Sequence, residues 1–87
     1  MLTIYSKAHC PQCDNAKGLL TLKEIQFNEI KVDQDKVARE WLMEQGHRSV
    51  PQLYLDGKLF VKDGYKGLLD LTDSQLQEKL GDSNVSN

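Results

Sequence analysis

The chain has 87 residues, of which 39% are hydrophobic and 28% are charged, and its formal net charge is -2. This length allows one compact domain, and the mixed composition is typical of a soluble globular protein rather than a disordered one. Lysines and arginines are spread among the acidic residues and the apolar runs are short, which argues against nucleic-acid binding and membrane insertion. We therefore expect a cytoplasmic protein, and we take it to be a monomer.

The spacing of apolar residues predicts strands and helices along the whole chain. In chain order we expect a strand over 2–6, a helix from Pro11 to about Lys23, a strand over 25–32, a helix that ends at Gly46, strands over 52–55 and 58–62, and a last helix over about 72–81. This βαβαββα order implies one parallel crossover and one antiparallel hairpin. The fold class is therefore α/β, with a four-stranded mixed sheet flanked by three helices, and residues 82–87 are expected to be disordered.

Local signals support several of these elements. Asp33 or Asp35 can cap the second helix, in which Trp41 lies on the apolar stripe and is assigned to the core. Asp56-Gly57 is a strong hairpin signal, because both residues tolerate the positive φ of a tight turn. Residues 72–75, Thr-Asp-Ser-Gln, have the spacing of a capping box and predict the start of the last helix.

The two cysteines lie in the segment Cys10-Pro11-Gln12-Cys13, where the first strand passes into the first helix. At a helix start, the helix dipole and unpaired N–H groups favour the thiolate over the thiol, which makes Cys10 the candidate nucleophile. Cys13 follows about one helical turn later, so it can attack a mixed disulfide on Cys10 and release the reduced substrate. The motif predicts thiol–disulfide exchange with proteins or small thiols.

A structural disulfide, a zinc site and ordinary core cysteines are the alternatives for this pair. A bridge that closes so short a loop constrains the unfolded chain little. Zinc needs four ligands, and His9 and His47 match no zinc-finger spacing. No metal site is therefore predicted. Both histidines are interpreted as surface or loop residues, although His9 can tune the thiolate beside it.

Three segments together resemble the glutaredoxin family: Tyr5-Ser6-Lys7-Ala8-His9-Cys10-Pro11-Gln12-Cys13, the tripeptide Ser49-Val50-Pro51, and the Asp56-Gly57 hairpin. The resemblance covers about residues 1–80 and implies the thioredoxin fold for a domain over 1–81. It also implies that no cofactor is bound and that glutathione is a cosubstrate.

The resemblance assigns further residues to substrate or glutathione. It implies that Pro51 is cis and packs opposite Cys10, with Val50 presenting backbone groups to the ligand. From the residues alone, a trans proline that opens a strand is the default. Lys7 is placed near the thiolate and a glutathione carboxylate, with a solvated surface lysine as the alternative. The remaining residues assigned to this site are Gln12, Arg48, Gly64 and Tyr65.

The sequence departs from the family in two places. The family usually has an aromatic residue at the position of Gln12, and the amide here is similar to the glutaredoxin-like electron donors of ribonucleotide reductase, including phage versions. Many members have acidic residues for the α-amino group of glutathione where this chain has Lys66 and Gly67. Asp63 and Asp70 are the candidates to replace them.

Three functional hypotheses follow. The first is a glutathione-linked dithiol oxidoreductase that reduces protein disulfides, with ribonucleotide reductase as a candidate substrate, and Lys7 and Pro11 favour it. The second is a glutaredoxin-like protein recharged by a thioredoxin reductase, which the departures at Gln12 and Lys66 favour. The third is a non-catalytic binding module of the same fold, against which the paired cysteines argue.

Overall fold

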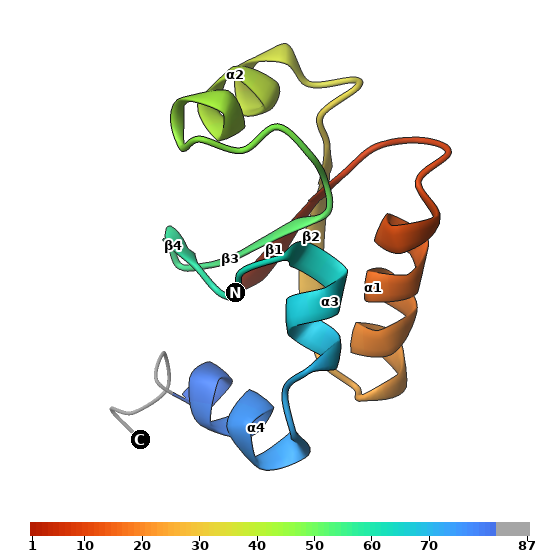
Figure 1. The fold of residues 1–87 in the computed structure, drawn as a ribbon, viewed down its shortest axis with the longest axis vertical. Coiled ribbons are helices and arrows are strands. Elements are labelled where there is room, and N and C mark those ends of the chain that lie inside the picture. Colours follow the sequence, from red (N-terminus) through yellow and green to blue (C-terminus); the bar gives the residue numbers. More distant parts are fainter. Residues whose placement is uncertain (82–87) are drawn as a thin grey trace.

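Four strands form one mixed sheet in the computed structural model, which describes residues 1–81 (Figure 1). The strands are β1 (Leu2–Ser6), β2 (Phe27–Lys31), β3 (Gln52–Leu55) and β4 (Lys58–Leu59), and their order in the sheet is β2-β1-β3-β4. β1 pairs in parallel with β2 and antiparallel with β3, which pairs antiparallel with β4. The predicted mixed sheet is confirmed. The predicted disorder of 82–87 lies outside the described residues.

The helices cover both faces of this sheet. They are α1 (Pro11–Leu22), α2 (Lys36–Glu44), α3 (Gly64–Leu69) and α4 (Asp73–Gly81). Leu2 and Ile4 of β1 point into the main core, which also contains buried residues of α1, α3 and α4. Tyr5 points to the opposite face, as strand alternation requires, and packs against a second cluster that includes Leu42 of α2. Figure 1 shows α1 and α3 side by side, with α2 apart from them.

The predicted caps and turn form as expected. Asp35 caps α2, because its Oδ1 accepts a hydrogen bond from the Ala38 N–H at 3.0 Å. Thr72 and Gln75 make both hydrogen bonds of the capping box that starts α4. Asp56-Gly57 has positive φ at both residues (51° and 87°), as a tight hairpin turn requires.

β2 covers only 27–31 of the strand expected over 25–32, and the structure differs from the sequence-based expectations in three further ways. The short helix α3 was not predicted, because Gly64 and Gly67 are poor helix formers that mask its pattern. β4 ends at Leu59 rather than at residue 62, since the chain turns into α3 through Asp63, whose φ is 64°. Trp41 is only half-buried at the edge of the second cluster.

No helix within 1–81 has the length and apolar character needed to span a membrane.

Candidate active site

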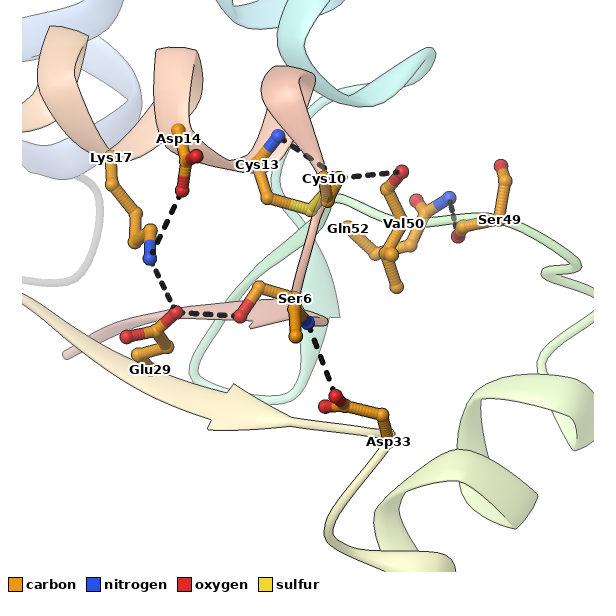
Figure 2. Close-up of a disulfide and its surroundings, with 11 residues drawn as sticks. Ser6, Cys10, Cys13, Asp14, Lys17, Glu29, Asp33, Ser49, Val50 and Gln52 are labelled. Carbon is orange, nitrogen blue, oxygen red and sulfur yellow. Dashed lines mark hydrogen bonds and ion pairs between the residues drawn. A yellow bond between two sulfur atoms is a disulfide. The ribbon is translucent and has the colours of Figure 1, made fainter.

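The two cysteines form a disulfide at the N-terminus of α1 (Figure 2). Cys10 is the N-cap residue, with extended backbone angles, and Pro11 occupies the first helical turn, where the N–H that it lacks has no partner in the helix. The N–H of Cys13 donates a hydrogen bond to Cys10 Sγ over 3.1 Å. The sulfur of Cys10 therefore takes the position that a serine or aspartate oxygen holds in an ordinary cap.

The two cysteine residues differ in exposure. Cys10 is 7% exposed, whereas Cys13 is fully buried at 0% beneath the helix end. Of the two, only Cys10 has surface that an incoming disulfide can contact. When the bridge is reduced, the Cys13 N–H and the helix dipole both stabilise a negative charge on Cys10 Sγ. The geometry supports the predicted roles of nucleophile and resolving thiol.

The Val50–Pro51 peptide bond is cis, as the family resemblance implies. The carbonyl oxygen of Val50 lies 3.9 Å from Cys10 Sγ, so this loop faces the disulfide. The Gln52 side chain donates a hydrogen bond to the Ser49 carbonyl at 2.9 Å and bridges the residues on either side of the proline. Gly64 packs against the same loop, since a Cβ there would lie 2.5 Å from the Pro51 carbonyl oxygen.

Two surface grooves meet at this loop. The first, here called the Lys7 groove, has a volume of about 540 Å³. The second, the Lys66 groove, has a volume of about 650 Å³. Residues that line the Lys7 groove include Lys7, Val32, Arg39, Leu42, Met43 and Arg48. Those of the Lys66 groove include Gln12, Pro51, Leu59, Lys62, Gly64 and Lys66. His47, Ser49 and Val50 line both grooves.

The grooves are lined by all the residues that the sequence assigned to the ligand except Tyr65. Lys7 and Arg48 lie in the Lys7 groove, Gln12 and Gly64 lie in the Lys66 groove, and Val50 joins the two. Tyr65 lies in neither groove and packs, half-buried, against the main core. Gly67 is required by packing rather than by a ligand, because a Cβ there would overlap the carbonyl of Lys62.

A polar network beside the disulfide was not foreseen (Figure 2). Glu29 Oε2 accepts hydrogen bonds from the hydroxyl of Ser6 at 2.6 Å and the ammonium of Lys17 at 2.7 Å. The bond from Lys17, and then that from Ser6, lower the pKa of Glu29, and the bond to Glu29 raises the pKa of Lys17. Lys17 also pairs with Asp14. The network ties α1 to both β1 and β2, which holds the helix that carries the cysteines.

His47 is the second feature that the sequence did not reveal. It is half-buried rather than a plain loop residue, and its Nε2 lies 2.7 Å from the hydroxyl of Tyr54. Tyr54 packs edge-on against Trp41 and Tyr5, and burial, followed by the nearby Tyr5, raises its pKa. Within 1–81, no three His, Cys, Asp or Glu side chains gather as a metal site would require.

Known proteins that are similar to this chain agree with the geometry of the site. The glutaredoxin family model matches residues 2–60. Glutaredoxin 3 of Escherichia coli (strain K12) is 38% identical over 56 residues, which cover 63% of this chain and 68% of that protein. The glutaredoxin-like protein NrdH of Lactococcus lactis subsp. cremoris is 40% identical over 60 residues, 69% of this chain and 83% of the relative.

A solved structure agrees with the predicted thioredoxin fold. The buckwheat glutaredoxin–glutathione complex superposes with a TM-score of 0.75 at 26% identity, over 93% of this chain and 76% of that one. The family match spans the cysteine motif, the cis-proline loop and the hairpin, which are the elements that form the site. The chain therefore belongs to the glutaredoxin family of thiol–disulfide oxidoreductases.

Proposed function

We propose that this protein reduces protein disulfides as a monomer in the cytoplasm, that glutathione is the cosubstrate that restores its dithiol, and that no cofactor is bound. Ribonucleotide reductase is the protein substrate that we propose first. The observation that carries the proposal is the unequal exposure of the two cysteine residues, 7% for Cys10 at the helix start against 0% for Cys13. One sulfur can receive a substrate and the other can only resolve the product.

The reaction begins when the Cys10 thiolate attacks one sulfur of the substrate disulfide and displaces the other as a thiolate. The Cys13 thiol then loses its proton and attacks Cys10 Sγ, which releases the second substrate sulfur as a thiolate. The substrate gains two electrons and takes up two protons, while the protein is left with the Cys10–Cys13 bridge. This bridge is the form that the structure holds. Two glutathione thiols reopen it and leave as glutathione disulfide.

The Lys7 groove supports glutathione as the reductant. Lys7 and Arg48 both line this groove and are exposed, and glutathione carries two carboxylates that such cations attract. The backbone of Val50 lies at the groove junction, where an extended peptide can pair with it. The likeness to a glutaredoxin–glutathione complex supports the same reading.

The Lys66 groove favours a second candidate, in which a thioredoxin reductase recharges the protein. Lys62 and Lys66 bring two positive charges to the region where the family resemblance places the α-amino group of glutathione. Two cations repel that ammonium. The nearby Gln12 is similar to glutaredoxin-like donors rather than to typical glutaredoxins. The similarity to an NrdH protein favours this candidate and also the choice of ribonucleotide reductase.

A coupled assay separates the two candidates. The oxidised protein is supplied either with glutathione and glutathione reductase or with thioredoxin reductase, and consumption of NADPH is followed with a disulfide-bridged protein as the final acceptor. We expect turnover with glutathione, and none for Cys10→Ser. Turnover with thioredoxin reductase alone would overturn the glutathione linkage. A parallel reaction with ribonucleotide reductase as acceptor tests the proposed substrate.

A further inference from the structure

The grooves beside the disulfide are lined by positively charged side chains that have no ion-pair partner among the described residues. Lys7, Arg39 and Arg48 line the Lys7 groove, and Lys62 and Lys66 line the Lys66 groove. All five side chains are exposed. None of the five forms an ion pair with a carboxylate among residues 1–81. Their charges are therefore available to a molecule that enters the grooves.

The acidic residues of the grooves do not cancel this charge. Asp33 and Asp63 are the two carboxylates among the lining residues, against five cations. Asp33 Oδ2 accepts a hydrogen bond from the Ala8 N–H at 3.2 Å, which directs it to the loop between β1 and α1. The whole chain carries a formal net charge of -2, so positive charge is concentrated around the active site while the rest of the protein is acidic. A field of this sign attracts anionic partners and speeds their association.

The grooves also offer apolar surface. Val32 and Leu42 are buried in the floor of the Lys7 groove, and Met43 at its side is 62% exposed. Leu59 of the Lys66 groove is 40% exposed. Single exposed apolar side chains also occur elsewhere on the surface, so these two help to identify the occupant only together with the surrounding charge. A small anion alone would leave them uncovered, whereas a polypeptide segment can cover them.

We propose that the two grooves together form a docking surface for an extended, acidic segment of the protein substrate. This proposal rests on the proposed reduction of protein disulfides and adds the chemistry that selects the substrate. The reactive cysteine of the segment lies at Val50, which lines both grooves and whose carbonyl oxygen is 3.9 Å from Cys10 Sγ. Carboxylates on one side of that cysteine face Arg39 and Arg48, and those on the other side face Lys62 and Lys66. An apolar side chain of the segment covers Met43.

Disulfide-bridged peptides of matched sequence test this surface. Three peptides differ only in the residues that flank their reactive cysteine, which are glutamates, glutamines or lysines. The dithiol form of the protein is freed of its reductant and mixed with each peptide, so the measured rate of peptide reduction does not depend on how the protein is recharged. Each rate is divided by the rate of the same peptide with dithiothreitol, which removes differences in intrinsic reactivity.

The glutamate peptide should react fastest and the lysine peptide slowest, with a ratio of about tenfold at low salt, as several exposed charge pairs acting together allow. The ratio should fall to about twofold or less near 0.5 M salt, because screening then acts within a few ångströms. Equal normalised rates for the three peptides would overturn the docking surface. Failure to reduce any peptide would instead overturn the proposed reduction of protein disulfides, and the docking surface with it.

Charge-reversal variants test whether the groove residues cause the preference for the glutamate peptide. The double variant Arg48→Glu, Lys62→Glu places one acidic residue in each groove and should abolish or invert the preference for the glutamate peptide. Lys58→Glu is the control for a single reversal, because Lys58 is exposed at the β3–β4 hairpin and pairs with Leu55, which lies opposite Leu2 at the end of β1 away from Cys10. It changes the net charge by -2, against -4 for the double variant, and it does so outside the grooves. It should keep the preference, whereas Lys62→Glu alone should weaken it. A loss of preference in Lys58→Glu equal to that in the double variant would contradict the assignment to the grooves.

Discussion

The network around Glu29 makes a pH-dependent contribution to stability that Glu29→Gln should remove. Its Oε2 accepts hydrogen bonds from Lys17 and from Ser6, whose side chain is fully buried. Glutamine keeps an oxygen that can accept both bonds, so the substitution removes the charge and leaves the buried hydroxyl with an acceptor. The side chains of Lys17 and Glu29 are each 27% exposed, so solvent screens part of their attraction.

The stability lost in Glu29→Gln should lie between the contribution of an exposed ion pair and that of a buried charged hydrogen bond. We expect Glu29→Gln to lower the free energy of unfolding by about 1 kcal/mol near pH 7. For a domain of this size such a loss lowers the Tm by about 4–8 °C. Folding lowers the pKa of Glu29 from its ordinary value of 4.5. The stabilisation is therefore complete above that value and disappears as the pH falls through the lower pKa of the folded state.

Urea denaturation of both proteins over a series of pH values measures this directly, with the disulfide kept closed throughout. The gap in free energy of unfolding between wild type and Glu29→Gln should be present near neutral pH and should disappear as the solution becomes strongly acidic. Glu40→Gln is the control, since Glu40 is exposed on α2 and lies outside the network. A gap that persists unchanged in acid would show that the lost stability does not come from the Glu29 charge.

Three further predictions follow from single contacts. Gly67→Ala should lower the free energy of unfolding by about 1–3 kcal/mol in urea denaturation, because its Cβ would overlap the Lys62 carbonyl; unchanged stability would contradict this contact. Asp35→Ala should cost about 1 kcal/mol through loss of the α2 cap, whereas Asp35→Asn should retain most of it. Lys66→Asp should lower the glutathione concentration needed for half-maximal turnover by about two- to fivefold at low salt and less at high salt; an unchanged concentration would show that Lys66 does not face the ligand.

The features that could be predicted from the sequence are those set by neighbouring residues. The cysteine motif, the Asp35 cap and the Asp56-Gly57 turn each depend on side chains within four positions of one another. The reactive end of the site, with Cys10 at a helix N-terminus, was therefore visible before the fold was known. The isomer of Pro51 was implied only by the family resemblance, since the residues alone favoured trans.

The features that were missed depend on contacts between distant segments. Ser6 and Glu29 are 23 positions apart, and Lys17 is 12 positions from Glu29, so no local pattern connects the network. His47 is held by its contact with the hydroxyl of Tyr54, and only the fold brings these two residues together. α3 was missed because its glycines weaken the helical pattern, although Gly64 is there to fit against Pro51, 13 positions earlier.

The assignment of nucleophile and resolving thiol is tested most directly by glutathione adducts of the single cysteine variants. Cys13→Ser and Cys10→Ser are treated with glutathione disulfide, and adducts are located by mass spectrometry over time. Because Cys10 lies at the helix start and is 7% exposed, whereas Cys13 is fully buried, we predict rapid modification of Cys10 in Cys13→Ser and no modification of Cys13 in Cys10→Ser. An adduct on Cys13 in Cys10→Ser, with none on Cys10 in Cys13→Ser, would contradict the proposed roles.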